Sequence, residues 1–355
     1  MLTRPSDAAA TARLDIDLSA LLHNYRTLQA RAGTAEVAPV VKADAYGLGA
    51  AAIASHLARN GATTFFVARL SEGVDLRKAL GSGPVIYVLD GLSEPAVFAA
   101  HDLRPVINSA DQYQRWISAP DTLAAALHID TGMNRLGVRV GDLDALPSRG
   151  RRPLALVMSH LVCGDEPNSP LNPQQLTIFN AVTARFPGVP RSLANSGGHF
   201  LGADYHFDVT RPGISLYGGG PFGKTVPDIR QVATLKAQVL QVGHIEGGET
   251  VGYGASFKAR NPMWIATLGI GYADGLMRSF GAYGFATVNG ERRHLAGRIS
   301  MDLCCLDVTD LDVAVGDWVE ILGPGQPVDE VAHASSTISY EILTRIAARV
   351  ERHYI

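Results

Sequence analysis

The chain has 355 residues, a length that suits about two domains. Hydrophobic residues make up 46% of it and charged residues 18%, so the composition excludes a disordered protein. The formal net charge of -3 argues against a nucleic-acid-binding protein, and no apolar run approaches the roughly 20 residues that a membrane-spanning helix needs.

The first residues argue against secretion, and the cysteines argue against a disulfide framework and a CxxC metal site. Residues 1–12 contain no apolar segment, so they do not predict a secretory signal. Cys163, Cys304 and Cys305 form neither a CxxC pair nor a disulfide framework. We therefore expect a cytoplasmic enzyme without a metal site.

Short apolar runs alternate with amphipathic stretches from about residue 14 to residue 214. Buried parallel strands are expected at 37–41, 64–67, 85–89, 105–107, 125–130, 154–159 and 192–194. Helices are expected at 18–30, 70–80, 95–100 and 173–186. Seven or eight such units favour a closed α/β barrel of the (β/α)8 type, similar to a TIM barrel. An open doubly wound sheet is the alternative, although no GxGxxG turn supports it.

The sequence changes character after about residue 230. Extended strands are expected at 232–245, 264–269, 284–288, 293–299, 303–308 and 318–322. The dipeptide Asn289–Gly290 predicts a two-residue hairpin turn, and a helix is expected near 337–350. We therefore predict a barrel domain over 13–235 and a mostly β domain over 236–355, which residues 1–12 could join.

Lys42 is the first candidate for chemistry. It ends an apolar run and opens the segment KADAYGLG (42–49). Catalytic groups of a barrel lie at the C-terminal ends of its strands, and a partly desolvated lysine there can form a Schiff base. The glycines that follow allow close approach of a ligand, and Tyr46 offers a phenol to a phosphate.

The segment VKADAYG (41–47) resembles the pyridoxal-phosphate lysine motif of bacterial alanine racemases, which are fold-type III enzymes. Other segments resemble further motifs of that family, in the family's order: HIDTGMNRLG (128–137), ANSG (194–197), RPGISLYG (211–218), TVGYG (250–254), GIGYADG (269–275), GRISMD (297–302) and TISYE (337–341). The resemblance covers nearly the whole chain. It implies pyridoxal 5'-phosphate as the cofactor and a head-to-tail homodimer with active sites at the subunit interface.

The resemblance implies two catalytic bases. Lys42 would hold the cofactor and serve the D-enantiomer, whereas Tyr272, entering from the partner subunit, would serve the L-enantiomer. Racemisation removes a proton from one face of the α-carbon and returns one to the other, so it needs a base on each side. A tyrosine with a pKa of about 10 needs assistance, and His160 matches the family residue that hydrogen-bonds this tyrosine.

The resemblance also implies roles for residues around the cofactor. Arg211 would face the pyridine nitrogen, and because arginine only donates, it would keep that nitrogen unprotonated and limit transamination. Arg135 would lie near the substrate carboxylate. Met301 and Asp302 would come from the other subunit to the substrate mouth, and Asn195 would be a supporting residue. The implied phosphate ligands are Tyr46, Ser196, Gly213, Ile214 and Tyr340.

Two positions depart from the family pattern. His128 stands where many members have a lysine that becomes carbamylated, so what occupies that site and positions Arg135 is open. Leu48 replaces a residue that is often histidine, which alters only the loop surface.

The predicted activity is the interconversion of L-alanine and D-alanine, an isomerase reaction that supplies D-alanine for cell-wall peptidoglycan. A decarboxylase of the ornithine or diaminopimelate type is an alternative, but such enzymes place an acidic group at the pyridine nitrogen. A cofactor-binding homeostasis protein is another, but it is a single barrel, and residues 236–355 argue against it. Substrate breadth and a biosynthetic or catabolic role do not follow from the sequence.

Overall fold

The computed structural model describes residues 10–150 and 152–355. Within these ranges the contacts divide the chain into two units, Leu22–Leu216 and residues 10–21 with Tyr217–Ile355. Residues 1–9, which carry most of the expectation about the N-terminal segment, lie outside the described residues. The domain limits expected at residues 235 and 236 stay a prediction.

The first unit contains a curled sheet of short parallel strands. Its strands are β2 (Glu36–Val37), β3 (Thr64–Val67), β4 (Val85–Val88), β5 (Arg104–Ile107), β6 (Ala125–Asp130), β7 (Val138–Arg139), β8 (Leu154–Met158), β9 (Arg191–Ser192) and β10 (Val209–Thr210). The pairing runs β3-β4-β5-β6-β8-β9, with β7 added beside β6, and β10 pairs with β2. All four residues of β3 are buried, as expected for strands covered on both faces.

Backbone hydrogen bonds close this sheet into a barrel. The Val41 N–H donates to the Phe66 carbonyl at 2.8 Å, which joins the segment after β2 to β3. On the other side, the Asp208 N–H donates to the Arg191 carbonyl at 3.0 Å, which joins β10 to β9. The (β/α)8 prediction is therefore confirmed. The two-residue strand β10 was not predicted, because it is too short to produce a periodic apolar pattern.

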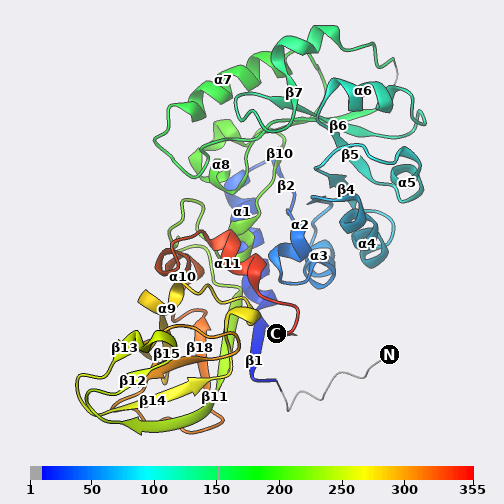
Figure 1. The fold of residues 1–355 in the computed structure, drawn as a ribbon. Coiled ribbons are helices and arrows are strands. Elements are labelled where there is room, and N and C mark those ends of the chain that lie inside the picture. Colours follow the sequence, from blue (N-terminus) through cyan, green and yellow to red (C-terminus); the bar gives the residue numbers. More distant parts are fainter. Residues whose placement is uncertain (1–9, 151) are drawn as a thin grey trace. The chain divides into compact units, whose positions relative to one another are not determined.

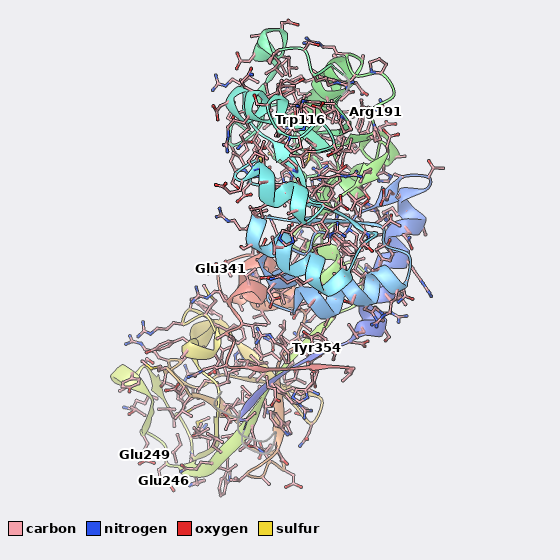
Figure 2. The ribbon with its side chains drawn as sticks, turned by 90° about the vertical axis from the view of Figure 1, so that its right-hand side faces the viewer. Trp116, Arg191, Glu246, Glu249, Glu341 and Tyr354 are labelled. Atoms are coloured by element: carbon pink, nitrogen blue, oxygen red, sulfur yellow. The ribbon has the colours of Figure 1, made fainter. Side chains whose placement is uncertain are left out.

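Helices alternate with these strands and surround them (Figure 1). They are α1 (Leu18–Ala32), α3 (Ala50–Arg59), α4 (Leu70–Leu80), α5 (Pro95–Ala100), α6 (Ala110–Ile117), α7 (Leu171–Thr183) and α8 (Ser196–Leu201). Four of them confirm the predicted helices, although α7 ends three residues early. In α6, the side chain of Trp116 is fully buried, and its Nε1 donates to the Leu123 carbonyl at 2.8 Å (Figure 2).

The second unit is built on the long strand β11 (Ala233–Ile245), whose first residues alternate between buried and half-buried. The other strands of its main sheet are β1 (Ala12–Ile16), β14 (Met263–Leu268), β15 (Phe285–Val288), β16 (Glu291–His294), β17 (Cys304–Asp307), β18 (Trp318–Leu322) and β19 (Glu351–Tyr354). A separate pair is formed by β12 (Thr250–Val251) and β13 (Phe257–Lys258). Figure 2 shows Glu246 and Glu249 just beyond the end of β11.

The predicted hairpin turn is confirmed between β15 and β16. Asn289 and Gly290 have φ angles of 50° and 80°, which are those of the turn that matches the twist of paired strands. The strand expected over 293–299 is wrong in its limits, since β16 ends at His294. The strand β1, at the other end of the chain, pairs with β11 and β19 in this sheet.

The helix expected near 337–350 is shorter in the structure. The second unit contains α9 (Phe280–Tyr283), α10 (Val328–Ala334) and α11 (Ser339–Arg345). After α11, the Arg352 guanidinium donates to the carbonyls of Ile346, Ala347 and Val350 at 2.6–2.9 Å. These carbonyls are satisfied without a continued helix, and the chain forms β19 instead. No helix within 10–150 and 152–355 has the length and the apolar run that a bilayer span requires.

Candidate active site

Lys42 opens a left-handed turn at the edge of the barrel. It follows Val40, which bridges Phe66 of β3, and it begins the single turn α2 (Lys42–Tyr46). Three residues of this turn, Ala43, Asp44 and Ala45, have φ angles of 52–53°, and Tyr46 has 58°. Four consecutive residues other than glycine in this region cost backbone energy, so the surrounding structure must hold them there.

Glu72, near the start of α4, holds the second residue of this turn, Ala43. Its carboxylate accepts the N–H of Ala43 at 2.7 Å and also those of Ala68 and Arg69 at 2.8 and 3.0 Å. Burial lowers the pKa of the Lys42 amine, the charge of Arg135 lowers it further, and Glu72 opposes these effects. A larger share of the amine is therefore neutral than for a lysine in water.

Arg211 is buried, with 4% of its surface exposed, and its guanidinium is held by hydrogen-bond acceptors. Its guanidinium donates to the Ser192 hydroxyl, to the Ser159 carbonyl at 2.6 Å and to the Leu193 carbonyl at 3.4 Å. Burial lowers its pKa to about 9, which still leaves it charged at neutral pH. The structure thus holds a fixed cation among β8 and β9.

His128, in β6, is buried and hydrogen-bonded to Asn108, with 2.8 Å between Nδ1 and Oδ1. The Asn108 amide nitrogen donates to the carbonyls of Leu89 and Val106 at 2.9 and 3.0 Å. Because this leaves the amide oxygen facing His128, Nδ1 of the ring carries the proton. Burial and the charge of Arg211 lower the pKa of His128 to about 4, so the ring is neutral at pH 7.

The electrostatic interactions place five of these groups in one cluster. Burial holds the pKa of His160 well below its usual value, and the charges of Arg211, Arg135, His128 and Lys42 add to that effect in this order. His160 lies two residues after the end of β8, and its carbonyl accepts from the Gln175 amide at 3.0 Å. The barrel therefore brings these five side chains, which come from segments far apart in the sequence, close together.

The barrel also has, around Gly213, a group of hydroxyl and backbone N–H groups of the kind that bind a phosphate. The Gly213 N–H donates to the Ser196 hydroxyl at 2.9 Å, and a Cβ at Gly213 would lie 2.1 Å from the Tyr46 hydroxyl. Glycine is therefore required where these two hydroxyls approach the backbone. Ile214 begins the helical turn η4 (Ile214–Tyr217), and the buried Ser215 hydroxyl has no hydrogen-bond partner among the described residues. Hydroxyl and N–H donors of this kind fit a phosphate.

Asn195 supports this group from the start of α8. Its side chain accepts the Gly198 N–H at 2.9 Å, which caps the helix and fixes the backbone of Ser196. Asn195 thus holds the start of α8 in place.

The second unit brings Tyr272, Met301 and Asp302 together. The short turn η6 (Tyr272–Asp274) is bonded to the 300–302 loop, since the N–H groups of Tyr272 and Ala273 donate to the carbonyls of Ser300 and Met301 at 3.0 and 2.9 Å. Tyr272 and Met301 are 39% and 54% exposed, so both are accessible on the surface of this unit.

Comparison with known proteins agrees with this arrangement. The family model described as "Alanine racemase, N-terminal domain" matches residues 16–221, and "Alanine racemase, C-terminal domain" matches residues 232–354. The catabolic alanine racemase of Mesorhizobium japonicum is 46% identical, with 99% of this chain and 95% of that protein covered. The biosynthetic alanine racemase of Agrobacterium fabrum is 43% identical, with 98% and 94% covered.

The chain belongs to the alanine racemase family.

A solved structure also matches over nearly its whole length. The alanine racemase from Bartonella henselae with covalently bound pyridoxal phosphate has a TM-score of 0.92 and 39% identity. The match covers 98% of this chain and all of the other. The alanine racemase fold, with a barrel followed by a mostly β domain, is therefore shown for this chain.

Three residues that hydrogen-bond to predicted site residues or to their neighbours were not predicted from the sequence: Glu72, Asn108 and Arg349. Glu72 has a local signal, because an acidic residue in the first turn of a helix commonly accepts backbone N–H groups. Asn108 and Arg349 have none, since each acts on residues distant in the sequence. The phosphate role of Tyr340, which lies in α11 with 39% of its surface exposed, stays a prediction.

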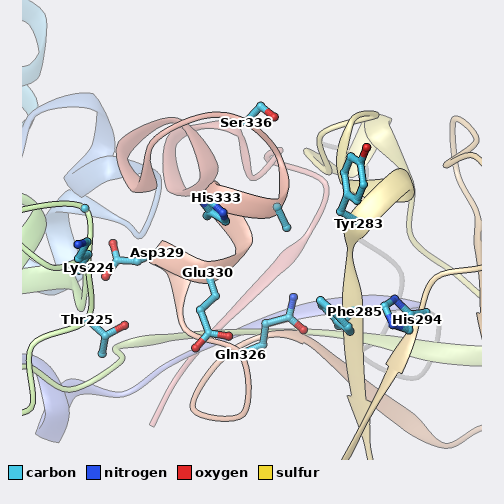
Figure 3. Close-up of a pocket in the computed structure, with 12 residues that line it drawn as sticks. Lys224, Thr225, Tyr283, Phe285, His294, Gln326, Asp329, Glu330, His333 and Ser336 are labelled. Atoms are coloured by element: carbon cyan, nitrogen blue, oxygen red, sulfur yellow. The ribbon is translucent and has the colours of Figure 1, made fainter.

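A cavity of about 870 Å³ in the second unit is separate from the residues predicted for racemisation. Its walls come from the 223–225 segment, α9, β15, β16 and α10, and Figure 3 shows Gln326, His333 and Tyr283 around it. None of the predicted site residues lines this cavity. It therefore contributes nothing to the proposed chemistry.

Proposed function

We propose that this chain interconverts L-alanine and D-alanine with pyridoxal 5'-phosphate as its cofactor. The observation that carries the proposal is that the Lys42 amine and the buried Arg211, which can only donate, both act electrostatically on His160. The relationship to alanine racemases over nearly the full length supports it.

The barrel residues fit the cofactor. Lys42 is the amine that attaches it covalently, and Tyr46, Ser196, Gly213 and Ile214 are donors for its phosphate, with Tyr340 as a further ligand. When bound, pyridoxal phosphate supplies an electron sink that stabilises negative charge at the substrate α-carbon. Arg211, a buried guanidinium that can only donate, would face the pyridine nitrogen, leave it unprotonated and restrict competing chemistry.

Lys42 and Tyr272 divide the proton transfers between them. The Lys42 amine would take or return the α-proton on the D side, and its lowered pKa suits it to that role. Tyr272 does the same on the L side, with His160 as its hydrogen-bond partner. Arg135 orients the substrate carboxylate, and Met301 and Asp302 line the substrate mouth.

The physiological part of the proposal concerns assembly and role. Tyr272, Met301 and Asp302 act from the partner subunit of a homodimer, so that each active site lies at the interface. The enzyme works in the cytoplasm and supplies D-alanine for peptidoglycan. The exposure of Tyr272 and Met301 on their own unit supports a partner contact.

The deciding experiment combines a visible spectrum with a chiral assay. The purified protein loaded with pyridoxal phosphate should show the absorbance of a Schiff base and should form D-alanine from L-alanine. Lys42→Ala should lose that absorbance. Release of carbon dioxide from a basic amino acid without racemisation would favour the decarboxylase alternative, and bound cofactor with neither reaction would favour a homeostasis protein.

A further inference from the structure

The turn that carries Tyr272 is held by backbone contacts on two sides. A Cβ at Gly271 would lie 2.3 Å from the Met301 carbonyl oxygen, and one at Gly275 would lie 2.3 Å from the Arg345 carbonyl oxygen. The backbone on both sides of Tyr272 therefore touches two other segments, the 300–302 loop and the end of α11. A shift of either segment moves Tyr272.

Arg349 joins all three segments through its guanidinium. Nε and one terminal nitrogen bind the two carboxylate oxygens of Asp274 at 2.6 and 2.9 Å, and the same terminal nitrogen binds Asp302 at 2.8 Å. Asp274 is 6% exposed, and its carboxylate also accepts the Gly271 N–H at 2.8 Å. The Asp274 carbonyl accepts the Ala347 N–H at 3.0 Å.

The geometry distinguishes the ion pair of Arg349 that fixes the Tyr272 turn from the one that contributes little. The pair with Asp302 is half-exposed on both sides, and such a pair alone contributes little to stability. The pair with Asp274 is bidentate on a buried carboxylate, and this planar arrangement fixes orientation as well as distance. The side chains of Tyr272 and Met301, by contrast, are too exposed to be fixed by packing.

We propose that Arg349 is a positioning residue for the base Tyr272, acting through Asp274, and for the substrate-mouth loop, acting through Asp302. The inference rests on the proposed function, because it concerns the base on the L side. It gives Arg349 no contact with the substrate. It predicts that loss of the guanidinium impairs proton transfer on one face of the α-carbon and spares the other.

The variant Arg349→Met allows proton transfer on the two faces of the α-carbon to be measured separately. Racemisation should fall about 10- to 100-fold in kcat, with a small change in KM, because a displacement of about 1 Å at a reacting group has this effect. In deuterium oxide, Lys42 removes the α-proton of D-alanine, exchanges it with solvent and returns a deuteron to the same face. This exchange without inversion should persist in Arg349→Met at close to the wild-type rate.

Two further variants complete the experiment. Arg349→Lys keeps the charge but cannot bind both oxygens of Asp274 in a fork, so its racemisation should be intermediate. Arg293→Met, in β16, removes an arginine whose ion pair with Glu291 is partly exposed and 2.7 Å long, and it should racemise like the wild type.

The remaining outcomes each decide the matter. Unchanged racemisation in Arg349→Met would overturn the proposal. Equal losses of racemisation and of D-alanine exchange would also overturn it, because Arg349 would then serve folding or cofactor binding in general. A wild-type protein that exchanges and racemises nothing contradicts the proposed function itself, and the role of Arg349 fails with it.

Discussion

Asn108 fixes the orientation of the His128 ring, with 2.8 Å between Oδ1 and Nδ1. Asn108 directly follows β5 and His128 lies in β6, and these strands are neighbours in the barrel. Both amide hydrogens of Asn108 are donated to carbonyls, so the amide can only accept from the ring. A neutral imidazole with a defined tautomer therefore occupies the position where many relatives were expected to carry a carbamylated lysine.

Stability should fall on acidification because of buried neutral histidines. The pKa values of His128 and His199 are about 4 in the folded protein, below the unfolded value of 6.5. Between pH 6.5 and 4 the unfolded state binds more protons, so the free energy of unfolding decreases as pH falls through this window and levels off below it. Each histidine contributes a slope of up to about 1.4 kcal/mol per pH unit.

His128→Gln measures the part of this slope that belongs to His128. Urea denaturation at a series of pH values should give a shallower dependence in the variant by up to about 1.4 kcal/mol per pH unit. If the variant and the wild type have the same slope between pH 6.5 and 4, the histidine is protonated in the folded protein and our account of its environment is wrong.

Glu72→Ala should disturb the left-handed turn that carries Lys42. The variant leaves the exposed Ala43 N–H without its 2.7 Å acceptor, so we expect a loss of about 0.5–1.5 kcal/mol in the free energy of unfolding. We also expect a decrease of about 10- to 100-fold in racemisation, since the amine shifts. Asp75→Ala on the same helix, where Asp75 pairs with the exposed Lys78, is the control. Equal behaviour of the two variants would contradict the role of Glu72.

Mixed subunits should test whether Lys42 and Tyr272 come from different chains. Lys42→Ala and Tyr272→Phe should each be inactive or nearly so. If the two chains are unfolded together and refolded as a mixture, half of the dimers pair one with the other, and one of their two sites is intact. About a quarter of the wild-type activity should therefore return. Failure to recover activity in a mixture proven to contain heterodimers would place both bases in one chain.

Arg211→Gln should weaken both the fold and the reaction specificity. The variant leaves the Ser159 carbonyl without its 2.6 Å donor, which should lower the free energy of unfolding by about 1–3 kcal/mol. Without a permanent cation at the pyridine nitrogen, transamination should increase relative to racemisation, and pyruvate should accumulate on prolonged incubation with alanine. Chiral analysis and a pyruvate assay on one sample give the ratio. A ratio equal to that of the wild type would contradict the role of Arg211.

The position of Lys42 was predictable because it follows the apolar run of a barrel strand, whereas Arg135, His160 and Arg211 were predicted from the family motifs. Parallel strands bring their C-terminal ends to one side of the barrel, so residues at these places meet whatever the loop lengths between them. The apolar runs located most of the barrel strands, because strands that are buried on both faces are apolar along their whole length. The strand β10 was less predictable, because two residues are too few to show an apolar period. The end of α11 was also less predictable, because the Arg352 side chain satisfies carbonyls that would otherwise accept helical hydrogen bonds.

The sequence by itself determined the family, the barrel and the residues with chemistry of their own, because motif order and apolar periodicity are properties of neighbouring residues. Only the tertiary structure decided how those residues are held. Glu72 is 29 residues from Ala43, Asn108 is 20 from His128, and Arg349 is 75 from Asp274. Hydrogen bonds over such separations depend on which strands and loops become neighbours, and no local pattern of residues specifies that.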